Sequence, residues 1–130
     1  MIFLACKQKT VPQPKWEWKT IAVTASAYNS VSWQTTGTNP SIAAWGDTLK
    51  PGMKSIAVSR DLLKLGLKHN TMVKIDTFPD TFYVMDKMNR KWHNRIDIYM
   101  GLDVKKARQW GKKKLKIRYA VPLDTIFTSK

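Results

Sequence analysis

The sequence has few acidic residues, one cysteine and two histidines, and these shortages narrow the possible classes of function. Asp and Glu number 9 against 23 Lys and Arg, so the formal net charge is +14. The single cysteine, Cys6, excludes a disulfide within the chain. His69 and His93 have no His or Cys partner at ligand spacing, which disfavours a zinc site. No glycine-rich phosphate-binding loop is present, and we expect no metal or other cofactor.

Long apolar runs are also missing. No run approaches the ~20 residues that a membrane-spanning helix needs. At 130 residues and 43% hydrophobic, the chain is long enough for one globular domain with its own core. The excess of positive charge favours a polyanionic partner, which could be nucleic acid, anionic lipid or an acidic cell-wall polymer.

The N-terminal segment resembles the end of a bacterial lipoprotein signal. Its apolar part is shorter than the roughly 7–15 residues of a signal-peptide core, but Leu4-Ala5-Cys6 resembles a lipidation site. The polar, proline-bearing stretch that follows is typical of a tether. We therefore expect residues 1–19 to form a tether, with Cys6 as a candidate lipid anchor and the cell envelope (periplasm) as the location. A frayed terminus with a chance cysteine is the alternative.

Short runs of β-branched and aromatic residues follow, separated by turn residues. They predict strands over 20–28, 54–58, 71–75, 81–85, 95–100 and 114–121. Two short helices are predicted between strands, over 59–66 and 103–110. Ser59 and Asp103 are suited to N-cap positions, and Gly66 and Gly111 are suited to helix ends.

The two predicted helices belong to similar units. Each unit reads strand, short helix ending in glycine, strand, as expected for a barrel with approximate internal two-fold symmetry. A layered α/β fold would need longer crossover helices. We therefore expect a mainly β fold, a small closed barrel of six strands with two short helices over residues 20–121, and a tail over 122–130.

Two aspartates, Asp86 and Asp97, stand eleven residues apart in this basic chain. In "RIDIYM", Asp97 and Tyr99 alternate with apolar residues, so both should point away from the core. A partly desolvated carboxyl has a raised pKa and can act as a general acid. Nearby cations such as Arg95 favour the ionised form instead. The alternative is that both aspartates merely pair with these cations or cap turns.

Residues 24–119 resemble a "3D" domain, the family named for three aspartates. The resemblance is carried by the order and spacing of "TASAY", "TTG", "IAV" followed by "LG", "MDKMNRKWHNRIDIYM" and "ARQWGKKKLKI". It implies a double-psi β-barrel related to membrane-bound lytic transglycosylase A, rare lipoprotein A and expansins. Asp86 matches the second family aspartate and Asp97 the third, which is the proposed acid/base of the transglycosylases. The first aspartate is replaced by Ser59, with Asp61 two residues further on.

The resemblance implies a cell-wall protein that acts on peptidoglycan. As a lytic transglycosylase it would cleave between MurNAc and GlcNAc with 1,6-anhydro product, Asp97 serving as acid/base and Asp86 positioning it or stabilising positive charge. The candidate substrate-binding residues are Tyr28, Thr35, Thr36, Gly37, Ser59, Asp61, Trp92, Arg95 and Tyr99.

Whether the protein is an enzyme stays open, because a non-catalytic, expansin-like glycan-binding module fits the same residues. Peptidoglycan glycan strands are the expected partner, with anionic wall polymer or a membrane surface as further ones and a monomer as the default state. Nucleic acid is disfavoured because no base-reading motif accompanies the basic stretch near the C-terminus.

Overall fold

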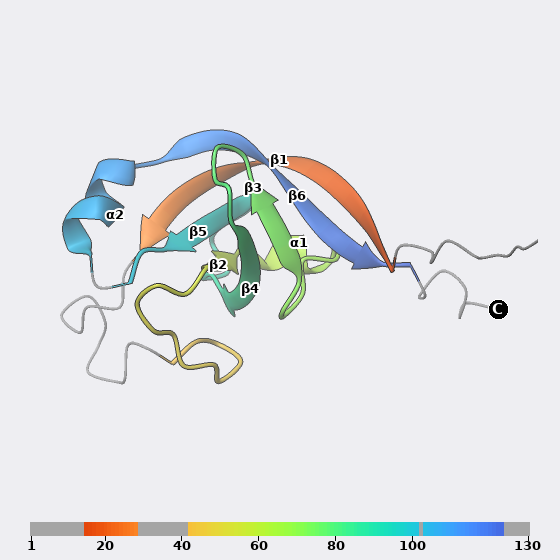
Figure 1. Ribbon diagram of the computed structural model, residues 1–130, viewed down its shortest axis with the longest axis horizontal. Helices are drawn as coiled ribbons and strands as arrows, with labels where there is room; N and C mark the ends of the chain where they lie inside the picture. The colour runs from red at the N-terminus through yellow and green to blue at the C-terminus, as the bar shows by residue number, and fades with distance from the viewer. Residues whose placement is uncertain (1–14, 29–41, 102, 124–130) are drawn as a thin grey trace, which may run out of the picture.

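A computed structural model describes residues 15–28, 42–101 and 103–123 of the chain (Figure 1). They form β1 (Trp16–Tyr28), β2 (Ser55–Val58), α1 (Arg60–Leu63), β3 (Met72–Ile75), β4 (Thr81–Lys87), β5 (Arg95–Tyr99), α2 (Val104–Trp110) and β6 (Lys113–Pro122). The prediction of a mainly β chain with six strands and two short helices is confirmed.

The six strands close into a barrel in the order β1-β5-β2-β4-β3-β6. Two neighbouring pairs, β1 with β5 and β2 with β4, are parallel, and the other pairs are antiparallel. Exchanging β1 with β4, β2 with β5 and β3 with β6 leaves both the order and the pair directions unchanged. The predicted internal two-fold repetition is therefore present in the topology, which is compatible with a double-psi barrel.

Strands β1 and β6 form the longest pair, from Trp16 opposite Pro122 to Ala25 opposite Lys113. Figure 1 shows them curving together over the barrel and running on beyond it toward one end. β1 begins at Trp16, four residues before the start that the sequence predicts. Residues 16–20 are exposed on both faces, so no apolar alternation marks them, and their pairing with β6 defines the strand.

Alternate residues of all six strands fill the core, as the period of two requires. The core also takes in Leu62 of α1 and Leu67, both fully buried. Burying each large aliphatic side chain stabilises the fold by about 1.5–3 kcal/mol. The strand residues of the core are Val23, Ala25, Ile56, Val58, Val73, Ile75, Phe82, Val84, Ile96, Ile98, Ile117 and Tyr119.

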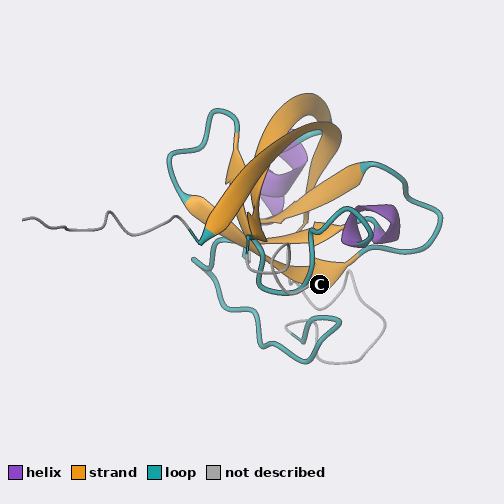
Figure 2. Ribbon diagram, turned by 90° about the vertical axis from the view of Figure 1, so that its right-hand side faces the viewer, coloured by secondary structure: helices purple, strands orange, loops and turns teal. Residues whose placement is uncertain are grey.

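The two helices lie apart from each other, one beside the strands and the other seen behind them in Figure 2. α2 begins as predicted, because the Asp103 side chain accepts a hydrogen bond of 2.8 Å from the backbone N–H of Lys106. It ends at Gly111, whose φ of 69° is favourable only for glycine. Trp110 of α2 packs on the core, and the centroid of its ring lies 5.2 Å from that of Phe78.

Candidate active site

Four adjacent strands carry a row of residues on the outer face of the barrel. Ser26 of β1 lies opposite Asp97 of β5. Asp97 lies opposite Ala57 of the central strand β2, and Ala57 in turn lies opposite Asp86 of β4. Strands are spaced about 4.8 Å apart, so the two aspartate backbones are roughly 10 Å apart with only a methyl group between them. The topology thus brings together two carboxylates that are eleven residues apart in sequence.

The predicted orientation of Asp97 is confirmed. Ile96 and Ile98 are buried in the core, so the alternate residues Asp97 and Tyr99 face the opposite side. Tyr99 is nevertheless buried, because the segment 42–53 covers this side of β5. Ala43 and Leu49 of that segment form a second, smaller apolar cluster with Tyr99. Asp97 lies on the same face of β5 as the covered Tyr99 and is itself half-buried.

Burial raises the pKa of the Asp97 carboxyl above its ordinary value. The Ser26 hydroxyl opposes this by donating a hydrogen bond of 2.9 Å to Oδ1, and the charge of Arg95 opposes it further. The negative charge of Asp86 adds to the rise. Since the net direction is upward, Asp97 can carry a proton closer to neutral pH than a free aspartate can.

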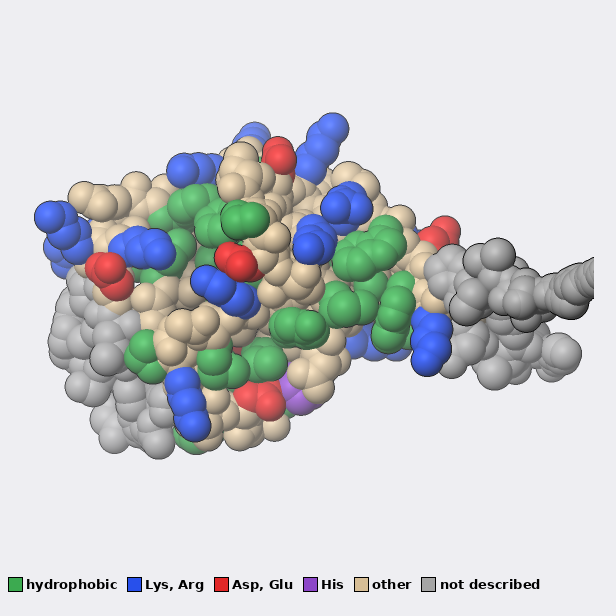
Figure 3. All heavy atoms as spheres, in the orientation of Figure 1, with side chains coloured by type: hydrophobic (Ala, Val, Ile, Leu, Met, Phe, Trp, Pro, Cys, Tyr) green, Lys and Arg blue, Asp and Glu red, His purple; other side chains and the backbone are tan. Residues whose placement is uncertain are grey.

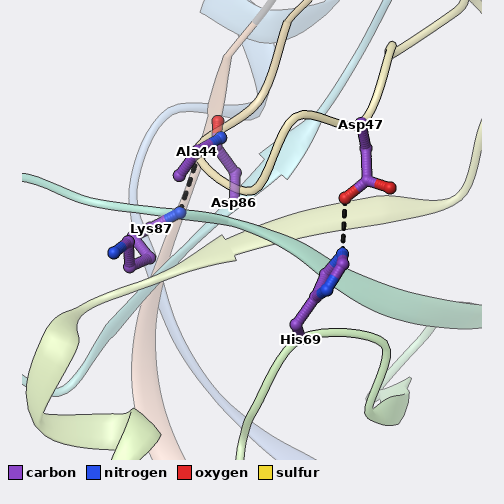
Figure 4. Close-up of polar contacts among 5 residues, drawn as sticks. All are labelled: Ala44, Asp47, His69, Asp86 and Lys87. Atoms are coloured by element: carbon purple, nitrogen blue, oxygen red, sulfur yellow. Dashed lines mark hydrogen bonds and ion pairs between the residues drawn. The ribbon is translucent and has the colours of Figure 1, made fainter.

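Asp86 is held by two backbone N–H groups (Figure 4). Ala44 and Lys87 donate to its Oδ1 at 2.8 and 2.9 Å. Burial raises the pKa of Asp86 overall, although both N–H groups and the Lys87 charge act in the opposite direction. The pairing of β2 with β4 shifts register between Ile56 and Ala57, and this irregularity sets Asp86 opposite Ala57.

Tyr28, at the end of β1, has a buried hydroxyl beside the row. Its ring lies 5.5 Å from that of Tyr99. Among the described residues, neither the Tyr28 hydroxyl nor the buried Ser55 hydroxyl has a hydrogen-bond partner of good geometry. The Ser55 hydroxyl nevertheless lies near enough to Tyr28 to lower its pKa slightly. Burial, followed by the charges of Asp86 and Asp97, raises the pKa of Tyr28 well above its ordinary value. The hydroxyl therefore stays protonated, and its burial keeps it from contact with a bound sugar.

The segment 42–53 is tied to the barrel by an ion pair and by stacked rings. Asp47 pairs with His69, as Figure 4 shows. The His69 ring also stacks on Trp45, with centroids 4.7 Å apart. Trp45 is therefore half-buried against His69, and the Lys87 ammonium lies 5.4 Å from the centroid of its ring.

Ser59 and Asp61 support the turn before β5 and make no hydrogen bond to either aspartate of the row. The Ser59 hydroxyl is fully buried and accepts from the backbone N–H of Arg95 at 2.9 Å. It makes no side-chain cap for α1. Asp61 accepts from the N–H of Asn94 at 2.9 Å. Burial alone would raise the pKa of Asp61, but the Ser59 hydroxyl and this N–H lower it overall.

Trp92 and Arg95 lie next to the row. The Arg95 guanidinium carbon is 4.1 Å from the centroid of the Trp92 ring, and its Nε donates to the Ser26 hydroxyl at 3.4 Å. Ser26 thus joins Arg95 to Asp97. Ser26 was missed from the sequence, although its place two residues before Tyr28 in a predicted strand puts both on one face.

Four predicted site residues lie outside the described residues. They are Cys6, Thr35, Thr36 and Gly37.

Within the part of the chain that the structure describes, no group of three or more His, Cys, Asp and Glu side chains could hold a metal ion. Nor is any helix in that part long and apolar enough to span a membrane. No protein-family model and no curated protein matches this chain. Membership of the 3D family is therefore a proposal.

Proposed function

We propose that this chain is a 3D-type double-psi barrel that acts on peptidoglycan glycan strands in the cell envelope, as a lytic transglycosylase. The observation that carries the proposal is the row in which Asp97 and Asp86 flank Ala57, both with raised pKa values. The order of the motifs along the sequence and the repeated topology of the barrel support the same family.

The chemistry requires one carboxyl group that gives and then takes a proton. Protonated Asp97 donates to the glycosidic oxygen while the bond from that oxygen to C1 breaks. The substrate's own 6-hydroxyl then attacks C1, and the Asp97 carboxylate accepts the proton that this hydroxyl loses. A 1,6-anhydro ring forms, and no water molecule has to be activated.

The surroundings of the two aspartates favour different protonation states. Asp86 accepts from two backbone N–H groups, which stabilise its carboxylate. Asp97 accepts from one hydroxyl, and the charge of Asp86 favours its protonated form. Asp97 is therefore the acid, and ionised Asp86 stabilises the positive charge that develops at C1.

A non-catalytic wall-binding module is the second candidate, and Ser59 favours it. This residue stands where the family has its first aspartate, and it is buried with its hydroxyl committed to the Arg95 backbone. It cannot supply a third carboxylate, and Asp61 is held by Asn94. Under this second function Asp86 and Asp97 would hold the glycan without cleaving it.

Digestion of purified peptidoglycan distinguishes the two functions when the soluble products are identified by mass. Products that end in 1,6-anhydro-muramic acid are expected for a lytic transglycosylase. Reducing ends that have gained water would indicate a hydrolase. If nothing is released while the protein still pellets with the wall material, the binding function is correct.

A further inference from the structure

Cationic side chains lie in register beside the outer face of β1, beginning next to the carboxylate row. Three alternate residues of β1, Thr24, Ala22 and Thr20, lie opposite Lys or Arg residues of the neighbouring strands β5 and β6. Residues two apart on a strand are about 6.8 Å apart, so the cations of β6, at positions 114 to 118, span roughly 14 Å along the strand. These cations, which we call the basic track, are Arg95 on β5, Lys114, Lys116 and Arg118 on β6, and Lys74 on β3.

Two hollows open along the basic track. One, of about 310 Å³, is lined by Thr24, Trp92, Arg95 and Lys114 among others, and none of its lining residues is acidic. The other, of about 450 Å³, lies further along β1 and is lined by the three remaining cations of the track. Its one acidic lining residue is Asp76. Figure 3 shows Lys and Arg side chains along the upper edge of the molecule, where β1 and β6 run in Figure 1.

The track is joined to the candidate acid by one side chain. Arg95 lines the first hollow and donates to Ser26, which donates to Asp97. A polymer strand that places a glycosidic bond at Asp97 would continue across the first hollow and along β6. Resting on the proposed function, we propose that the basic track binds the carboxylate or phosphate groups of the anionic wall polymer whose glycan lies at Asp97.

Single-stranded nucleic acid fits the track less well. Its binding depends on aromatic faces on which bases can stack. The two tryptophans beside the track each have a guanidinium over the ring, with Arg95 4.1 Å from the Trp92 centroid and Arg118 5.6 Å from that of Trp18. The ionised Asp86 of the carboxylate row at one end would also repel a continuous phosphate backbone, whereas a glycan carries its charges at intervals.

A matched pair of triple variants tests the track. Lys114→Gln/Lys116→Gln/Arg118→Gln removes three exposed cations from it. The control, Lys64→Gln/Lys105→Gln/Arg108→Gln, removes three exposed cations that line neither hollow. Calorimetric titration of the full chain with soluble polyglutamate and polyphosphate should show about a tenfold loss of affinity for the track variant and less than about twofold for the control. Equal losses would overturn the proposal, because net charge alone would then explain the binding.

Thermal unfolding verifies that both variants fold. If the track variant does not, the single change Lys116→Gln replaces it, with Lys64→Gln as control and an expected loss of about two- to threefold. An unchanged affinity in Lys116→Gln would overturn the proposal.

The source of the charge is identified by pelleting the protein with modified wall material. Binding should weaken after amidation of the carboxyl groups if these are recognised, or after hydrofluoric acid removes phosphate polymers if those are. No change after either treatment would overturn the proposal. The proposal would also be overturned if a short single-stranded DNA bound the protein more tightly than polyglutamate and polyphosphate and lost affinity in the track variant. If the wild type releases anhydro products but the track variant binds the anionic polymers as tightly as the wild type does, this inference is overturned. The proposed function would then still stand.

Discussion

Asp86 and Asp97 lie on either side of Ala57, two strands apart on the outer face of one barrel. Each carboxylate makes its own hydrogen bonds, and the charge of Asp86 favours protonation of Asp97. The chain has a formal net charge of +14, which favours ionised carboxylates. This arrangement nevertheless provides a local site where a carboxyl group can keep its proton.

Asp97→Asn should change the pH dependence of stability. The pKa of Asp97 lies above its ordinary value of 3.8, so the folded chain binds this proton more tightly than the unfolded chain. The resulting stabilisation is complete below about pH 4 and is lost as pH rises through the folded-state pKa. Measured by urea unfolding, the stability of the wild type relative to Asp97→Asn should therefore fall as the pH rises above about 4. A difference that stays flat or rises would contradict the desolvated position of Asp97.

Ser26→Ala should raise the pKa of Asp97 further. The Ser26 hydroxyl donates to the carboxylate and so favours the charged form. Losing this hydrogen bond removes a stabilisation of the charged form, and NMR titration of the Asp97 carboxyl carbon would detect the resulting rise in pKa. Ser26→Thr keeps the hydroxyl and is the control. A shift of the same size in both variants would show that the hydrogen bond does not set the pKa.

Ser59→Ala should destabilise the fold more than Ser55→Ala. Both serines are fully buried, but only Ser59 accepts a hydrogen bond, from the backbone N–H of Arg95. Leaving that buried N–H without a partner costs about 1–3 kcal/mol in the free energy of unfolding, whereas Ser55→Ala should be close to neutral. Chemical denaturation of the two variants measures this. The reverse order would contradict the support that Ser59 gives to β5.

Tyr28→Phe should separate stability from ligand binding. The Tyr28 hydroxyl is buried without a hydrogen-bond partner among the described residues, so its removal should leave the free energy of unfolding unchanged or raise it by about 1 kcal/mol. Binding to peptidoglycan fragments should change by less than about twofold, because the buried hydroxyl does not reach a bound sugar. A loss of affinity of about tenfold would contradict the burial of this hydroxyl.

Local patterns predicted most of the elements. Alternation in "RIDIYM" placed Asp97 and Tyr99 opposite the core, and Asp103 with Gly111 marked the ends of α2. The repeated strand–helix–strand units predicted the two-fold topology. These features depend on neighbours within a few residues, which a single sequence contains.

Features that depend on pairing between distant strands were not predicted. The extension of β1 to Trp16 follows from β6, and the register shift that sets Asp86 opposite Ala57 has no local signal. Ser59 occupies the predicted N-cap position, yet its hydroxyl accepts from Arg95. The pair of Asp47 with His69 joins residues 22 apart in sequence.

The most direct test of the account is digestion of purified peptidoglycan by the wild type, Asp97→Asn and the exposed control Asp80→Asn, with anhydro-muramic products counted by mass spectrometry. The account predicts products from the wild type and the control, and at least about a thousandfold fewer from Asp97→Asn. Equal release by a folded Asp97→Asn would contradict the role of Asp97 as the acid/base.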